Sequence, residues 1–261
     1  LINKFSKQEN PFFIFCSFWG PHAPYWPSED YMDLYDPKSI EPWPSFDDDL
    51  EGRPNYYKKF KEIFFPAAKK ADWNTWSKII SRYWAQASMI DNAIGMLVDY
   101  LKQEYLYDDS IIIFTSDHGE SIGIHGGMFD KGAIAYEEIY HIPMIVKLPK
   151  KFNHGKQCLE FVSTLDLVPT ICDIIGFSGM SFDGQSLYPV MLNPNIDFRD
   201  HWISEFHGHR LPIGQRILWY EDKKFVLNFA DTNEYYNLND DPYELNNIIQ
   251  IIPQKDVSIL H

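Results

Sequence analysis

One stretch in the middle of the chain sets the strongest limit on the fold. Between Trp76 and Tyr105 apolar residues recur at the spacing of one face of an amphipathic helix. Asp108 and Asp109 then mark a turn. The run at 111–114 that follows is short, apolar and β-branched, as in a strand buried inside a sheet. A long helix, a turn and a buried strand in this order predict an α/β domain.

Other segments extend this pattern. Residues 12–18 and 143–148 are apolar runs, and both are predicted to be buried strands. A helix is predicted over 167–175, with Asp166 as its N-cap and Gly176 just past its end. Strands that alternate with helices favour an α/β fold with a mainly parallel sheet flanked by helices.

The sequence changes character after residue 195. Residues 1–195 are therefore predicted to form the α/β domain, and residues 196–261 a small C-terminal antiparallel α+β subdomain. Short runs separated by turn residues predict its strands at 201–206, 216–220, 224–229 and 234–238. A helix near 242–249 is expected to close it. Within the first domain, residues 26–72 are rich in Pro, Asp and Tyr without a steady period, which predicts a long excursion with at most short helices.

The charge balance and composition narrow the possible partners. A net charge of −14 opposes the broad basic surface that nucleic-acid binding requires. No run approaches the roughly 20 apolar residues of a membrane helix, so no membrane span is predicted. The three cysteines have no C-x-x-C spacing, which indicates neither a zinc knuckle nor a disulfide framework.

Groups that can bind a metal and an anion follow the predicted strands. Asp117 and His118 come directly after the central strand, and ligands in open α/β sheets bind beyond the carboxyl ends of strands. Gly119 permits a tight turn in which both side chains reach one divalent ion. Lys131 follows in the same stretch, and His22 follows the first predicted strand. The sheet is therefore expected to bring these four side chains to one edge.

The remaining histidines fall into two groups. His125 lies among glycines, where the backbone could approach a bound anion closely, so we predict that it contacts substrate. The H-G-H-R motif of the C-terminal subdomain fits either a solvated turn or part of a substrate rim, and contributes His207, His209 and Arg210. His141 and His154 have no such placement and are interpreted as structural or surface residues.

Longer segments then occur in a recognisable order. They are P-F-F-I-F-C-S-F-W-G-P-H-A-P-Y, Y-W-A-Q-A-S-M-I-D-N-A-I-G, I-I-I-F-T-S-D-H-G-E, H-G-G-M-F-D-K-G, S-T-L-D-L-V-P-T-I-C-D-I-I-G, F-D-G-Q-S-L and E-Y-Y-N-L-N-D-D-P-Y-E-L-N-N. Their ordered combination resembles the sulfatase family of the alkaline phosphatase superfamily over nearly the whole chain. The resemblance implies an alkaline-phosphatase-like fold, present in part, and metal-dependent hydrolysis of a sulfate ester on a small molecule or glycan.

The resemblance also implies roles for four residues. Asp117 and His118 match metal ligands that usually hold calcium. Lys131 matches the lysine that contacts the sulfate and the leaving-group oxygen, and His22 matches the histidine of the P-H-x-P segment in the sulfate pocket. The C-x-P-x-R or S-x-P-x-R motif, whose Cys or Ser becomes the formylglycine nucleophile, does not occur in this sequence. We therefore expect an N-terminal half to be missing and this chain alone to be inactive.

Two other functions fit the same residues. A phosphonate or phosphate ester hydrolase of the same superfamily also carries D-H-G and a downstream lysine. A non-catalytic module that binds a metal or a glycan needs no nucleophile. The sequence predicts neither the ester nor the compartment, which could be periplasmic, secreted or cytoplasmic. A sheet cut short would expose an edge strand and an apolar face, so self-association is expected.

Overall fold

The described part of the chain comprises residues 1–132, 134–150, 152 and 155–252 in a computed structural model. His154, interpreted above as a structural or surface residue, lies outside it. The chain divides into two compact units, which interleave in sequence. The first contains residues 1–41, 72–112 and 147–151, and the second contains residues 42–71, 113–146 and 152 onward. Among the described residues, none of the helices is both long and apolar enough to cross a membrane.

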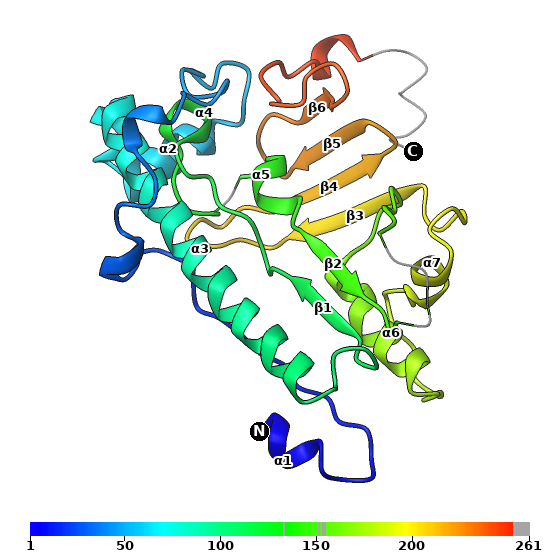
Figure 1. Cartoon of the computed structure of the whole chain (residues 1–261). Helices are drawn as coiled ribbons and strands as arrows, with labels where there is room; N and C mark the ends of the chain where they lie inside the picture. The colour runs from blue at the N-terminus through cyan, green and yellow to red at the C-terminus, as the bar shows by residue number, and fades with distance from the viewer. Residues whose placement is uncertain (133, 151, 153–154, 253–261) are drawn as a thin grey trace. The chain divides into compact units, whose positions relative to one another are not determined.

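Figure 1 labels the helices and strands of the described residues. The α-helices are α1 (Ile2–Phe5), α2 (Asn55–Phe64), α3 (Trp73–Gln103), α4 (Ile124–Gly127), α5 (Glu137–Tyr140), α6 (Leu167–Ile174) and α7 (Tyr188–Leu192). The strands are β1 (Ile112–Thr115), β2 (Met144–Lys147), β3 (His201–Phe206), β4 (Gln215–Tyr220), β5 (Lys223–Asn228) and β6 (Glu234–Asn237). Short 3-10 helices occupy Glu29–Tyr31, Pro37–Ser39, Ala68–Lys70, Thr164–Asp166 and Ile249–Ile251.

The first unit is built on α3, the long helix that the sequence predicts. The carboxylate of Asp72 accepts a hydrogen bond of 2.9 Å from the backbone N–H of Thr75, which caps the first turn. Trp76 is almost completely buried, as the apolar spacing requires. The hydroxyls of Tyr35 and Ser88 are hydrogen-bonded at 2.7 Å. These contacts hold the start of the irregular excursion against α3.

The strand predicted at 12–18 is wrong. This segment is not assigned to a strand, and the side chains of Phe13 and Phe15 are 68% and 81% exposed. A strand requires a neighbouring segment that completes its backbone hydrogen bonds. Among the described residues, no strand pairs with this run. Apolar composition alone therefore misled the prediction.

The strands predicted at 111–114 and 143–148 are confirmed. They are β1 and β2, which pair with each other in a two-stranded sheet. A mixed α and β composition is thus confirmed for the described chain. That the sheet of the α/β domain is mainly parallel stays a prediction.

The helix predicted at 167–175 is confirmed as α6, and Gly176 follows it with a φ of 71°. Asp166 is the N-cap residue of α6, as predicted, but its side chain forms no capping hydrogen bond to that helix. Instead, its buried carboxylate forms two hydrogen bonds of 2.9 Å with the guanidinium of Arg199. It also accepts one of 2.8 Å from the backbone N–H of Ser163. The charge on Arg199 offers the carboxylate a stronger partner than the helix N–H groups do.

The second unit contains the predicted antiparallel sheet, in the order β3-β4-β5-β6. Ile217 pairs with Val226 across β4 and β5, and both are fully buried. Together with Ala135 and Trp219 they form one core cluster. The four strands predicted from 201 to 238 are therefore confirmed. The domain boundary at residue 195 stays a prediction.

The helix predicted near 242–249 is wrong. The carboxylate of Asp241 accepts hydrogen bonds from the backbone N–H groups of Leu245, at 3.0 Å, and Asn246, at 2.8 Å. Glu244 has a φ of 50°, which a helix does not allow. The side chain of Asn247 accepts a hydrogen bond of 3.0 Å from the backbone N–H of Tyr235 on β6. Asp and Asn side chains here compete with helical hydrogen bonds and prevail.

The excursion at 26–72 is more regular than predicted, because it contains the ten-residue helix α2. Tyr57 and Phe60 of α2 are fully buried. Tyr57 belongs to a core cluster of the second unit that also contains Ile134 and Tyr136. The latter part of the excursion is thus a core element of the second unit.

Candidate active site

Asp117 and His118 lie just beyond the carboxyl end of β1, as predicted. The Nε2 atom of His118 is 3.4 Å from Oδ2 of Asp117, and the backbone N–H of His118 donates a 3.0 Å hydrogen bond to Oδ1. The Asp117 side chain is 84% exposed and the His118 side chain 34%. The structure therefore brings a solvent-accessible carboxylate and an imidazole together.

Gly119 fixes this turn against the helix α5. Its N–H donates a 2.8 Å hydrogen bond to the carbonyl of Ile139, and the N–H of Glu120 donates one of 3.1 Å to the carbonyl of Glu138. A Cβ atom on residue 119 would lie 1.8 Å from the carbonyl oxygen of Glu138. Only glycine permits this approach without moving the backbone. The position of Asp117 and His118 thus depends on the position of α5.

The pair fits part of a divalent metal site. A carboxylate oxygen suits Ca²⁺, but that ion takes about six to eight ligands. Asp117 and His118 cannot supply that number. The described residues contain no group of three or more His, Cys, Asp or Glu arranged to hold an ion. Any further ligands would have to come from water, substrate or segments outside this cluster.

Lys131 lies beside Asp130, which also contacts Arg210. The Lys131 Nζ atom is 3.5 Å from Oδ1 of Asp130, and the Arg210 Nη2 atom is 3.1 Å from Oδ2. Two of the predicted site residues, from segments far apart in sequence, therefore meet at one carboxylate. Sequence reasoning missed Asp130, because an adjacent Asp and Lys reads as an ordinary solvated pair.

The rest of the H-G-H-R motif is more exposed. The His207 side chain is 82% exposed, with Nε2 at 3.4 Å from Oε2 of Glu205. His209 is exposed and forms an isolated antiparallel bridge with Leu211. Gly208 has a φ of 99° in the same tight turn. Both histidines are free to contact a ligand at the surface, which leaves their predicted substrate role open.

His125 is completely buried. Its Nδ1 atom is 2.7 Å from Oδ2 of Asp48, and its ring stacks on Tyr136 at 3.5 Å between centroids. Burial alone would raise the pKa of Asp48, but hydrogen bonds from His125 and Leu50 and the charge of Arg53 hold it below its ordinary value. The predicted substrate contact of His125 gains no support, because a ring without exposed surface does not touch a ligand. Its environment fits a core role.

His22 lies in the first unit. Its Nδ1 atom is 2.7 Å from the carbonyl oxygen of Ala23, and its ring lies 4.9 Å from that of Trp19. Its predicted place beside the groups of the second unit stays a prediction. His141, interpreted as structural or surface, has a side chain that is 82% exposed, with Nδ1 at 3.8 Å from Oε2 of Glu137.

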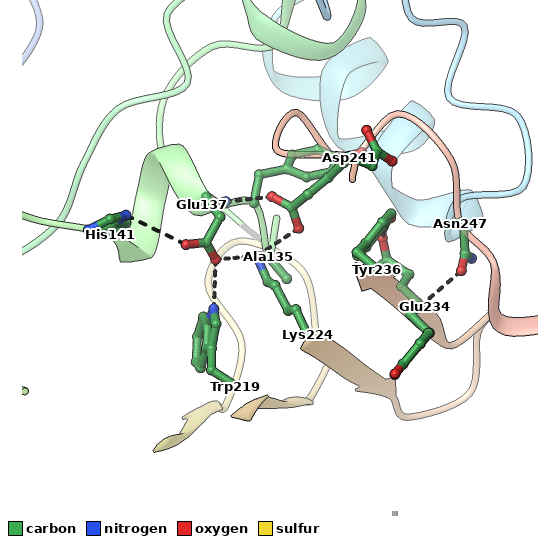
Figure 2. Close-up of polar contacts among 12 residues, drawn as sticks. Ala135, Glu137, His141, Trp219, Lys224, Glu234, Tyr236, Asp241 and Asn247 are labelled. Carbon is green, nitrogen blue, oxygen red and sulfur yellow. Dashed lines mark hydrogen bonds and ion pairs between the residues drawn. The ribbon is translucent and has the colours of Figure 1, made fainter. Parts of the chain in front are cut away.

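A buried ion cluster, which the sequence did not reveal, surrounds Lys224 (Figure 2). Its Nζ atom is 2.9 Å from Oε1 of Glu137 and 2.8 Å from Oε1 of Glu244. The indole N–H of Trp219 donates a 2.6 Å hydrogen bond to Glu137, whose own backbone N–H donates one of 2.7 Å to Glu244. Since Glu137 begins α5, the cluster anchors the helix that holds Gly119.

Burial and neighbouring charges shift the pKa values of the three ionisable groups in this cluster in different directions. Burial raises the pKa of Glu244 to about 8, against the opposing effect of Lys224. For Glu137 the outcome is reversed, because Lys224 and the Trp219 hydrogen bond outweigh burial and lower its pKa. Burial alone would lower the pKa of Lys224, but the two carboxylates raise it. Lys224 therefore stays charged, and of the two carboxyl groups Glu244 is the one that takes up a proton more readily.

Comparison with known families gives two matches that together span the chain. Residues 1–177 match the family described as Sulfatase, and residues 123–259 match the family described as N-sulphoglucosamine sulphohydrolase, C-terminal. A protein of Formosa agariphila named Sulfatase is 29% identical over 248 residues, which cover 91% of this chain and 48% of that protein. The chain spans about half the length of the curated relatives it matches most extensively.

Two solved structures illustrate the similarity in fold. One is a protein in complex with its substrate D-glucosamine-2-N,6-O-disulfate, with a TM-score of 0.78 and 21% identity over 92% of this chain and 62% of its own. The other is the phosphonate monoester hydrolase of Agrobacterium radiobacter, with a TM-score of 0.78 and 23% identity over 99% of this chain and 56% of its own. These similarities establish the fold that this chain shares.

Proposed function

The chain belongs to the sulfatase family, and from this premise we propose that the protein of which it is part hydrolyses sulfate esters. Water is consumed, the bond between sulfur and the ester oxygen breaks, and the products are an alcohol and inorganic sulfate. The observation that carries the proposal is the Asp117–His118 turn beyond β1, held by Gly119 against α5 within the matched residues.

The predicted metal-binding and catalytic residues each have a part in this proposal. Asp117 and His118 would hold part of a divalent metal site, with Ca²⁺ the expected ion, and the metal would supply positive charge to the sulfate oxygens. Lys131 would neutralise charge on the sulfate and the leaving oxygen, and His22 would donate a hydrogen bond or proton to that oxygen. The motif that yields formylglycine is absent from these 261 residues. The nucleophile would therefore come from outside them.

The proposed substrate is a sulfated small molecule or glycan. A protein of similar fold was solved with a disulfated glucosamine as its substrate. Arg210, His207 and His209 would contact the part of the substrate that carries the ester, since all three are partly or largely exposed. This assignment rests on exposure and on charge complementarity with an anionic ligand.

A phosphonate or phosphate ester hydrolase is the second candidate, because the Agrobacterium radiobacter enzyme shares the fold. An assay of the whole polypeptide with aryl sulfate and aryl phosphonate side by side separates the two. A much larger kcat/KM for the sulfate supports the proposal. Preference for the phosphonate overturns it. Binding of metal or glycan without turnover of either ester would indicate a non-catalytic module.

The first variant to test is Lys131→Ala in the whole polypeptide. Loss of a positive charge at the leaving oxygen should lower kcat for the aryl sulfate by about tenfold or more. The matched control is Lys150→Ala, which removes a lysine from an exposed pair with Asp108, at 3.3 Å. Steady-state kinetics and thermal unfolding measure the two effects. Turnover of Lys131→Ala equal to that of the control would remove Lys131 from the site.

A further inference from the structure

Asp130 lies between two cations and pairs each with a different oxygen. Oδ1 lies 3.5 Å from Lys131 Nζ, and Oδ2 lies 3.1 Å from Arg210 Nη2. The Asp130 side chain is only 13% exposed, whereas those of Lys131 and Arg210 are 22% and 38% exposed. The carboxylate is thus largely shielded while both cations reach solvent.

The backbone holds Asp130 as firmly as its side chain does. Its φ is 69°, in the left-handed region that Asp and Asn tolerate better than most residues. Its carbonyl oxygen accepts hydrogen bonds from the backbone N–H and the hydroxyl of the fully buried Ser121. Its Oδ1 also accepts a 2.9 Å hydrogen bond from the backbone N–H of Lys131. The carboxylate therefore has a fixed position.

Arg210 is held by aromatic rings as well as by Asp130. Its guanidinium lies 5.4 Å from the ring of Phe64 and 5.8 Å from that of Phe65, at the end of α2. A guanidinium has about five N–H donors in a planar fork that matches a carboxylate or sulfate. The salt bridge to Asp130 places Nη2 at 3.1 Å from Oδ2, and a carboxylate occupies at most part of these donors. The fork keeps donors for a ligand.

We propose that Asp130 is a positioning residue that fixes Lys131 and Arg210 as a pair, with Lys131 on the reacting sulfate and Arg210 on a second anionic group of the same substrate. Two neighbouring cations repel each other, and the shared carboxylate offsets that repulsion while leaving a net positive charge. Lys131 and the proposed metal already supply positive charge to the reacting sulfate, so Arg210 is available to select a substrate that carries a further sulfate or a carboxylate. This inference rests on the proposed function.

The test uses the whole polypeptide and two probes, inorganic sulfate and D-glucosamine-2-N,6-O-disulfate. Asp130→Asn removes the negative charge but keeps the shape of the side chain and the oxygen that accepts the Lys131 N–H. Asn also tolerates the left-handed backbone conformation. Arg210→Ala removes the second cation alone. Asp130→Glu restores the charge. The control is Asp222→Asn, at a carboxylate paired with Lys223 at the turn between β4 and β5.

Isothermal titration gives the affinities, and kinetics separate kcat from KM. Asp130→Asn should weaken binding of both probes by about tenfold, or 1.4 kcal/mol, and Asp130→Glu should recover part of the loss. Arg210→Ala should weaken only the disulfate, raising its KM with little change in kcat. Unchanged binding in Asp130→Asn, or equal weakening of both probes in Arg210→Ala, would overturn the inference.

Failure of the proposed function would give a different result. The wild-type protein could hydrolyse no sulfate ester while the variants lose binding in the expected pattern. That result would support the pairing of the two cations and overturn the hydrolase proposal. Thermal midpoints close to that of Asp222→Asn would confirm that the variants are folded. A large fall in the midpoint of Asp130→Asn alone would assign Asp130 a structural role and overturn the inference.

Discussion

Two charge clusters of the second unit are arranged in opposite ways. At Asp130 one carboxylate is shared by the cations Lys131 and Arg210, whose side chains are partly exposed. At Lys224 one fully buried ammonium is shared by the carboxylates of Glu137 and Glu244. The first cluster has spare donors that face solvent, so it can bind a ligand. The second has its charges matched inside the protein, so it can only hold the fold.

The buried cluster reaches the candidate site through the backbone. Glu137 starts α5, and the carbonyl of Ile139 in the same helix accepts the hydrogen bond from Gly119. The contact of Lys224 on β5 with Glu137 is therefore one step from the turn that carries Asp117 and His118. A buried charge network that fixes a helix end is well suited to hold a site in place.

The largest expected effect is on Lys224. Lys224→Met leaves Glu137 and Glu244 buried without their cation, which should lower the free energy of unfolding by about 3–5 kcal/mol. Denaturant unfolding of the chain measures it. The companion variant Lys224→Met with Glu137→Gln and Glu244→Gln removes the stranded charges and should recover part of the loss. A loss below about 1 kcal/mol, as for a surface pair, would contradict a structural role for the cluster.

Local patterns predicted most of the fold, because each depends on neighbours in sequence. The helix α3 and the strands β3 to β6 follow from periodicity and turn residues. The run at 12–18 failed because a strand depends on a partner segment as well as on composition. The segment at 242–249 failed because Asp241 and Asn247 take over the backbone hydrogen bonds. Both errors arise from contacts that a periodic pattern does not encode.

The candidate site was predicted in part for the same reason. Asp117 and His118 follow a strand directly, so their place could be inferred from the sequence. The meeting of Lys131 with Arg210 could not, because it depends on how the C-terminal segment folds back. The ion cluster around Lys224 could not be predicted either, because Glu137 and Lys224 are 87 residues apart in the sequence. Buried pairs of this kind have no local signature.

A smaller effect is expected from pH, acting through Glu244. Its pKa is about 8 in the folded protein, above the ordinary 4.5, so the folded state holds the proton more tightly than the unfolded state. Its contribution to stability is full below pH 4.5 and is lost as pH rises toward 8. Glu244→Gln mimics the protonated form and should flatten this decline.

The free energies of unfolding of the wild type and of Glu244→Gln, determined between pH 5 and pH 9, measure this loss of stability. From pH 5 to pH 9, the free energy of unfolding of Glu244→Gln should rise relative to that of the wild type by more than about 1.4 kcal/mol, the equivalent of one pKa unit. Burial also raises the pKa of Glu234. That residue is present in both proteins, so its contribution to the pH dependence cancels in the difference. Parallel curves would mean that Glu244 stays ionised beside Lys224 throughout.

The smallest stability effect is expected at Asp130, where the loss of one charge should matter most for binding. Asp130→Asn breaks two ion pairs, but both cations reach water and can be solvated, so the free energy of unfolding should fall by no more than about 1 kcal/mol. Denaturant unfolding at low and high salt measures it, and salt should shrink the difference further. A loss of unfolding free energy as large as that of Lys224→Met would mean that both clusters stabilise the fold. The exposure of a charged side chain would then not distinguish ligand-binding charges from structural ones.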